Sequence, residues 1–100
     1  MSTKPVRVVA RIKAKRDRIA RVREVLVSLL EPTRGESGCV VYELLQNDAD
    51  PADFTFVEEW STGQALEAHF ASPHFEQASA ALADLLAEPP DIRRYTLIGQ

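Results

Sequence analysis

The sequence predicts a single α+β domain in which helices cover one face of a four-stranded antiparallel sheet. Two periodicities alternate along the chain. In four segments apolar side chains recur at every second residue, as in strands, and in two segments they form stripes at helical spacing. Their order is β-α-β-β-α-β, the split βαβ pattern of the ferredoxin-like fold. The chain has 100 residues, which suits one domain, so we assign residues 1–100 to it, with the core over 6–98.

The first strand and the first helix are predicted from a change of period. Residues 6–12, VRVVARI, have apolar side chains at every second position and therefore read as a strand. Residues 16–31 place an apolar stripe opposite arginines and glutamates, as an amphipathic helix does. Pro32 and Gly35 are expected to end this helix.

The next two strands are predicted over 39–46 (CVVYELLQ) and 54–60 (FTFVEEW), with a connecting loop rich in Asn, Asp and Pro. The earlier strand is apolar on both faces, with Cys39, Val41 and Leu45 on one side and Val40, Tyr42 and Leu44 on the other. Because the helices can cover one face only, the other would expose an apolar patch. We therefore expect that face to pack against a second copy in an isologous homodimer.

The second helix is predicted to be broken in the middle. Ser61 and Gln64 form a capping-box pair that indicates its start. The dipeptide Ser72-Pro73 repeats the start signal, because it joins a good N-cap to a proline in the first helical turn. The second piece should run to about Leu86 before two prolines, and a last strand should follow over 92–98.

Composition excludes several classes of protein. No apolar run approaches the roughly 20 residues that cross a bilayer, so no membrane association is expected. The N-terminal stretch lacks the small-residue cleavage site of a signal peptide, and a cytoplasmic protein is the expectation. Cys39 is the only cysteine, which rules out an internal disulfide and a multi-cysteine metal site. We expect it to be a small core residue.

Charge is distributed unevenly along the chain. Nine of the twelve Lys and Arg residues lie in the first 23 positions, beside a single acid, Asp17. A basic arm can indicate nucleic-acid binding. These residues, however, alternate with apolar ones, as on the wet face of a strand and then a helix, so we predict a solvated face and no nucleic-acid partner.

Two histidines in HFASPHF (69–75) are candidates for chemistry, because histidine titrates near neutral pH. His69 falls on the apolar stripe of its helix and should face the sheet near Tyr42 and Trp60. It could be a buried histidine bonded to a backbone carbonyl, or a functional base. His74 could hydrogen-bond at the helix break or face the mouth of a cavity. A metal site is not expected, because this spacing does not align two ligands and no acidic residue is seen to complete a set.

Glu58 shares a strand face with Phe54, Phe56 and Trp60. If it were buried among them, its proton affinity would rise and it could act as an acid or base. The interpretation we favour from the sequence is that Glu58 reaches solvent or an arginine, such as Arg93 or Arg94. The chain has no glycine-rich phosphate loop or dinucleotide fingerprint, so no nucleotide cofactor is expected.

Three motifs resemble those of the antibiotic biosynthesis monooxygenase domain. They are ESGCVVYEL (36–44), FTFVEEW (54–60) and ALEAHFASPHF (65–75), in the family's order. The resemblance implies a dimeric α/β-barrel, in which two sheets pack face to face and each subunit has a pocket between sheet and helices. Some members of the family oxidise quinols or polycyclic phenols with O2 and no metal or flavin. The axial histidine position of haem-degrading relatives falls near Ser79, so haem is not expected.

The resemblance carries Tyr42, Trp60, His69 and His74 over from the family motifs. Together with the strand and helix faces, it leads us to predict roles for seven residues, with a small aromatic molecule and O2 as the reactants. His69 would deprotonate the substrate with help from Tyr42, and Trp60 would complete an apolar box that excludes water. The residues predicted to bind the substrate are His74, Phe56, Phe70 and Glu58. No cofactor is expected.

Two other functions remain open from the sequence. One is isomerisation of a small phosphorylated dicarbonyl, in which Arg93 or Arg94 would contact the phosphate. The other is non-catalytic binding of an aromatic molecule by the dimer.

Overall fold

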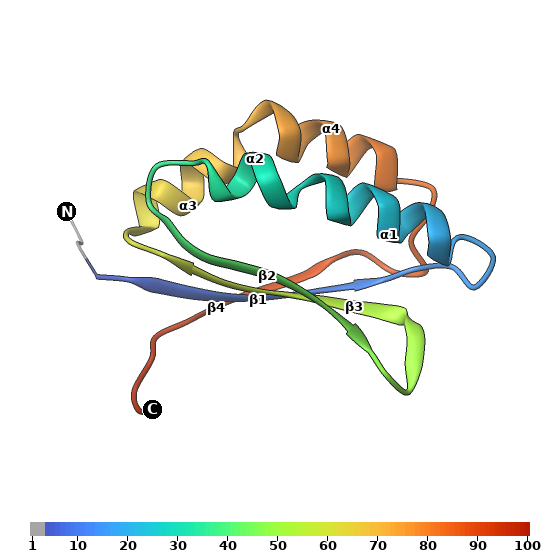
Figure 1. Ribbon diagram of the computed structural model, residues 1–100, viewed down its shortest axis with the longest axis horizontal. Helices are drawn as coiled ribbons and strands as arrows, with labels where there is room; N and C mark the ends of the chain where they lie inside the picture. The colour runs from blue at the N-terminus through green and yellow to red at the C-terminus, as the bar shows by residue number, and fades with distance from the viewer. Residues whose placement is uncertain (1–3) are drawn as a thin grey trace.

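The computed structural model describes residues 4–100 and has the predicted order of elements (Figure 1). These are β1 (Val6–Lys13), α1 (Ile19–Ser28), α2 (Leu30–Arg34), β2 (Cys39–Asn47), β3 (Asp50–Trp60), α3 (Gly63–Phe70), α4 (Pro73–Leu82) and β4 (Asp91–Tyr95). The strands form one sheet in the order β2-β3-β1-β4 with antiparallel neighbours. The ferredoxin-like prediction is confirmed. None of the helices in the described part is long and apolar enough to span a membrane.

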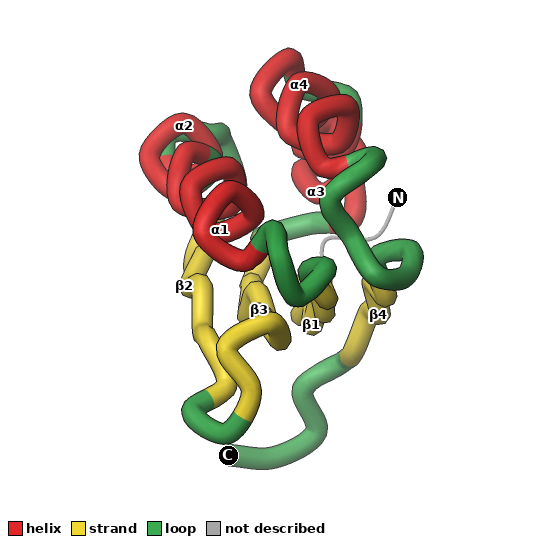
Figure 2. The backbone as a smooth tube through the Cα atoms, turned by 90° about the vertical axis from the view of Figure 1, so that its right-hand side faces the viewer, coloured by secondary structure: helices red, strands yellow, loops and turns green. Residues whose placement is uncertain are grey.

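All helices lie on one face of the sheet, as two parallel rows (Figure 2). One row contains α1 and α2, and the other contains α3 and α4. The register of the sheet explains which side chains meet them: Ala10 lies opposite Phe56 and Ile12 opposite Phe54. These four residues are almost fully buried. The apolar face predicted for the strand over residues 6–12 is therefore the face that the helices cover.

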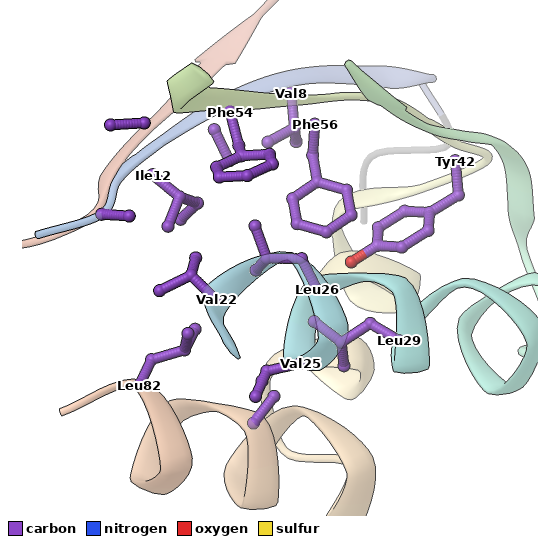
Figure 3. Packing of buried hydrophobic residues seen from close by; sticks show 14 of the residues in the cluster. Val8, Ile12, Val22, Val25, Leu26, Leu29, Tyr42, Phe54, Phe56 and Leu82 are labelled. Atoms are coloured by element: carbon purple, nitrogen blue, oxygen red, sulfur yellow. The ribbon is translucent and has the colours of Figure 1, made fainter. Parts of the chain in front are cut away.

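The core lies between the helix layer and the sheet (Figure 3). Helix α1 contributes Val22, Val25 and Leu26, which are its buried residues. Figure 3 shows Phe54, Phe56 and Tyr42 in a row along the sheet, with Leu26 and Leu29 facing them. This arrangement places aromatic rings from β2 and β3 next to the helices.

No helix of residues 4–100 lies over the other face of the sheet. A β-bulge between Cys39 and Val41 shifts the register of β2, so Cys39 lies opposite Trp60 and packs against the core. The predicted grouping of Cys39 with Val41 and Leu45 is therefore wrong at Cys39. Leu45 is 51% exposed and Val40, at the bulge, is 56% exposed.

Basic residues of the N-terminal region pair with acidic residues of β3. Arg7 contacts Glu59 at 3.0 Å, and both Lys13 and Arg16 contact Asp50, at 3.0 and 2.7 Å. These contacts agree with the interpretation of the basic stretch as a solvated face.

Several element boundaries differ from the predictions. The first helix begins at Ile19 and breaks at Leu29, and Pro32 lies inside the short α2, which ends at Gly35. Proline is tolerated there because the first turn of a helix does not use its backbone N–H groups. Strand β3 begins at Asp50, so much of the predicted loop is strand.

The second half of the chain also contains one wrong cap. The Thr62 side chain, and not that of Ser61, accepts a hydrogen bond from the Ala65 N–H at the start of α3. The break at Ser72-Pro73 is confirmed, because the Ser72 hydroxyl caps α4. The last helix ends at Leu82, before the predicted Leu86.

Candidate active site

A cavity of about 720 Å³ lies between the helices and the sheet, and we call it the central cavity. This volume falls within the usual range for sites that bind small molecules. Its aromatic and acidic wall is formed by Tyr42, Phe56, Glu58, Phe70 and Phe75. Mostly aliphatic side chains from β1, α1, α4 and the segment 83–90 after α4 line most of the rest, with Glu88 as a second acidic residue, so the cavity is mainly apolar.

Glu58 is a carboxyl group in this apolar wall. Its side chain points toward the helices, and the residue is 5% exposed. The indole Nε1–H of Trp60 donates a hydrogen bond of 2.8 Å to Glu58 Oε1. Burial raises the pKa of Glu58 to about 7, although the hydrogen bond from Trp60 opposes the shift. Glu58 can therefore both accept and return a proton near neutral pH.

The interpretation favoured for Glu58 from the sequence is wrong, because the residue meets neither solvent nor an arginine. Arg94 pairs with Glu67 on α3, and Arg93 pairs with Asp91 at 2.9 Å. Neither arginine is among the residues that line the central cavity. In the structure the Glu58 carboxyl is buried among aromatic side chains, as the alternative interpretation expected.

Tyr42 lies beside Glu58 in the cavity wall. The two residues are directly opposite each other on β2 and β3, and the Tyr42 ring stacks on Phe56 at 4.8 Å between ring centres. Burial raises the pKa of Tyr42 and the neighbouring Glu58 carboxylate adds to the shift. The phenol therefore keeps its proton and remains a hydrogen-bond donor.

His69 faces the sheet as predicted but does not line the central cavity. It is 1% exposed, and its ring lies 4.8 Å from that of Trp60 and 5.6 Å from that of Tyr42. Its Nδ1 is 2.7 Å from Oε2 of Glu36, so its partner is a carboxylate and not the backbone carbonyl considered above. Burial lowers the pKa of His69, and the hydrogen bond with Glu36 opposes that shift. Trp60 is also fully buried behind the cavity wall.

His74 lies at the helix break and contacts the same carboxylate. Its Nε2 is 2.6 Å from Oε2 of Glu36. The residue lines a second, smaller hollow between α1 and α4, outside the central cavity. The expectation that no acidic residue lies near the two histidines is wrong, because Glu36 reaches both.

Two residues of this region were missed in the sequence. Glu36 opens the motif ESGCVVYEL, but it lies more than 30 positions before the histidines, and spacing alone gives no sign of the contact. Phe75 follows His74 on the inner stripe of the last helix, and this stripe was the available signal. Its ring packs against His69 at 5.0 Å and Phe70 at 5.3 Å.

The sequence matches the family model described as antibiotic biosynthesis monooxygenase over residues 5–81. The chain belongs to the antibiotic biosynthesis monooxygenase family. Membership indicates a monooxygenase-like function, and the match includes Tyr42, Glu58, Trp60, His69 and His74.

Relatives of known structure support the same assignment. A Mycobacterium tuberculosis protein named "Putative monooxygenase Rv0793" is 34% identical over 87 residues, which cover 87% of this chain and 85% of that one. Its structure matches with a TM-score of 0.91 at 28% identity, over 97% of this chain and 98% of that chain. The crystal structure of PA3566 from Pseudomonas aeruginosa matches with a TM-score of 0.90 at 31% identity, over 99% and 98%.

A longer relative is also found. A Synechocystis protein named "Uncharacterized protein sll1783" is 32% identical over 93 residues, or 93% of this chain. The chain spans 63% of the length of that relative.

Proposed function

We propose that this protein is a monooxygenase that oxidises a small electron-rich phenol or quinol with O2 in the central cavity, with Glu58 as the proton acceptor. The observation that carries the proposal is a carboxyl group with a pKa of about 7 in an apolar, aromatic-lined cavity. The monooxygenase class comes from family membership. The substrate class and the roles of the residues are our inference.

Glu58 suits proton transfer better than His69 does. A base must come within hydrogen-bond reach of the proton that it removes. Glu58 lines the cavity, whereas His69 is enclosed behind Trp60 and Phe75. Trp60 engages Oε1 of Glu58, which leaves Oε2 as the oxygen that would meet a substrate hydroxyl. We therefore propose Glu58 as the base, in place of the His69 predicted from the sequence.

In the proposed reaction the substrate supplies all the electrons that reduce O2. The Glu58 carboxylate accepts a hydroxyl proton from a hydroquinone, and the phenolate gives one electron to O2. The superoxide and the ring radical then form a carbon–oxygen bond at a ring C–H carbon, giving a peroxide anion. Its O–O bond breaks as the ring proton passes to the departing oxygen, which yields a ring carbonyl and hydroxide. The proton held by Glu58 then converts the hydroxide to water. In total, one hydroquinone and one O2 give one hydroxyquinone and one water.

Tyr42 and the apolar wall would assist the two halves of this reaction. The Tyr42 hydroxyl keeps its proton and could donate a hydrogen bond to the oxygen on which charge develops. The phenylalanine rings would pack against the substrate and exclude water from the radical pair. Phe56, Phe70 and Phe75 are the aromatic residues in this role.

His69 and Trp60 are proposed as positioning residues. The His69 ring packs on Trp60, and Trp60 holds the Glu58 carboxyl through its indole N–H. His74 is outside the cavity and is proposed to act through Glu36, which it shares with His69. The chain of contacts from the helix break to the carboxyl group therefore runs through side chains that do not touch the substrate.

The active form is proposed to be a homodimer formed through the open face of the sheet. Val40, Leu45 and Tyr95 are each about half exposed on or beside this face. The residues after β4 leave the sheet on the same side, and they include the exposed Leu97 and Ile98 (Figure 1). Burial of this surface against a second copy would remove an apolar patch from water.

Oxygen uptake with a panel of substituted hydroquinones tests the function. Wild type should consume one O2 per hydroxyquinone formed. Glu58→Gln, which keeps the shape and an acceptor for Trp60, should lower kcat/KM by about 10²–10⁴. Glu31→Gln, on the exposed surface of α2, is the matched control and should keep the wild-type rate.

The same assay separates the two candidate bases. His69→Gln should lower kcat while the pH profile keeps a rising limb near pH 7, because Glu58 remains. A full rate in Glu58→Gln together with loss of that limb in His69→Gln would return the role of base to His69. Saturable quenching of Trp60 fluorescence by quinones without oxygen uptake would instead indicate a binding protein. The isomerase alternative is not supported by the positions of Arg93 and Arg94, which lie outside the cavity lining.

A further inference from the structure

Three side chains from separate parts of the chain converge where α3 gives way to α4. Glu36 lies in the turn between α2 and β2, His69 in the last turn of α3, and His74 in the first turn of α4. One Nδ1, one Nε2 and one carboxylate oxygen lie within 4.8 Å of one another. The helix break brings the histidines together, with 6.1 Å between their ring centres, although their spacing in sequence is not that of a helical ligand pair.

The two nitrogen–oxygen distances of the cluster are close to those of a metal site. Both imidazole nitrogens approach the same oxygen, Oε2 of Glu36, at 2.7 and 2.6 Å. Around a tetrahedral ion with bonds of about 2.0–2.2 Å, the ligand atoms would be roughly 3.3 Å apart. Each nitrogen–oxygen distance would therefore lengthen by less than about 1 Å if an ion replaced the shared protons.

The ligand set has the chemistry of a transition-metal site. Two imidazoles and one carboxylate are the ligands of a common class of zinc centre, which keeps a fourth position for water or another ligand. Metal binding requires neutral imidazoles, so binding should weaken as the pH falls and protons compete for the two histidines. The side chain of His74 is 25% exposed and that of Glu36 is 14% exposed, so an ion could enter from the surface.

The backbone around the three residues is held in place. The Ser72 hydroxyl donates a hydrogen bond of 2.7 Å to the His69 carbonyl, and the Cys39 N–H donates one of 3.2 Å to the Glu36 carbonyl. The His69 ring is held between Trp60 and Phe75. Ligands that are already oriented lose less entropy when an ion binds.

We propose that Glu36, His69 and His74 form a binding site for one divalent transition-metal ion per protomer, with Zn²⁺ as the best match. The ion would join the α2–β2 turn to the α3–α4 break and so stabilise the fold. None of the three residues lines the central cavity, so this inference does not depend on the proposed oxidation reaction. Its effects are measured as binding and stability.

Calorimetric titration of chelator-treated protein with Zn²⁺ tests the site. We expect one ion per protomer and a higher midpoint of thermal unfolding when Zn²⁺ is present. Glu36→Gln and His74→Gln should each weaken binding at least tenfold. Glu76→Gln is the matched control, because it removes an exposed carboxylate from the helix that contains His74. This variant should bind Zn²⁺ as wild type does.

Cobalt provides a second readout that a merely structural role of the triad would not give. Co²⁺ in a tetrahedral site absorbs strongly in the visible range, and these bands should appear in wild type and disappear in His74→Gln. His74 is partly exposed, so this variant should fold, which circular dichroism would verify. Failure of wild type to bind either ion, or equal binding by wild type and both variants, would overturn the proposal and identify the triad as hydrogen bonds only.

Discussion

The indole N–H of Trp60 donates a 2.8 Å hydrogen bond to the carboxyl group of Glu58, two residues earlier on the same face of β3. This contact fixes one carboxyl oxygen inside an apolar layer, where burial favours the neutral acid. Trp60 itself packs on His69, which contacts Glu36. The carboxyl group of the cavity is thus connected through side chains to the break between α3 and α4.

Replacement of Glu58 by Gln should stabilise the protein at alkaline pH and have little effect in acid. The native pKa of about 7 lies above the ordinary value of 4.5, so the native state binds more protons than the unfolded state between these pH values. The free energy of unfolding therefore falls as pH rises through this window. A shift of this size corresponds to a cost on the order of 3 kcal/mol above pH 7, which Gln avoids.

Urea denaturation of wild type and Glu58→Gln at pH 4.5 and pH 8 measures this difference. The variant should be more stable at pH 8, by up to about 3 kcal/mol, and close to wild type at pH 4.5. A difference that is the same at both pH values would show that Glu58 does not titrate with a raised pKa.

Replacement of Gly38 by Ala should destabilise the protein by more than about 2 kcal/mol. Gly38 has φ of +88°, and a Cβ there would lie 2.6 Å from the Cβ of Ala65 and 2.8 Å from the hydroxyl of Ser61. The strand or α3 would have to move. Gly63→Ala is the matched control, because a Cβ there meets nothing within 4 Å, and it should gain about 0.5–1 kcal/mol. Equal effects of the two substitutions on the thermal midpoint would contradict this account.

Val41→Asp should disrupt the proposed homodimer. Val41 lies opposite Glu59 on the open face, so the new carboxylate would be buried next to another at the interface. Sedimentation should give wild type a mass twice that of the 11.1 kDa protomer, and the variant a mass near one protomer or an insoluble product. Val27→Asp charges an exposed valine on α1 and should remain dimeric. A monomeric wild type at micromolar concentration would refute the proposed dimer.

The fold was predictable because local periodicity and global topology agree. In β1 and α1 the apolar positions of the sequence pattern are the positions that the fold buries, so the pattern indicates both the element and its inner face. The break at Ser72-Pro73 was predictable because it depends on neighbouring residues only. The bulge at Cys39 was not, because nothing in CVVYELL marks where an extra residue enters the ladder.

Sequence reasoning named four of the residues that line the central cavity, whereas the other three that it named, His69, Trp60 and His74, lie outside the lining. Tyr42, Phe56, Phe70 and Glu58 were named from their strand or helix faces, and all line the central cavity. Pattern reasoning placed His69 toward the sheet, but it could not show that Trp60 and Phe75 enclose it. The contact between Glu36 and the histidines joins residues more than 30 positions apart, and only the tertiary fold brings them together.

Carboxyl carbon NMR of protein labelled in its glutamate side chains tests the central claim most directly. One resonance should titrate with a pKa of about 7, disappear in Glu58→Gln, and change its pKa when a redox-inactive phenol occupies the cavity. The resonances of exposed glutamates should be unaffected by the phenol. If the Glu58 resonance titrates near 4.5, or does not respond to the phenol, Glu58 is not the proton acceptor of an apolar substrate cavity.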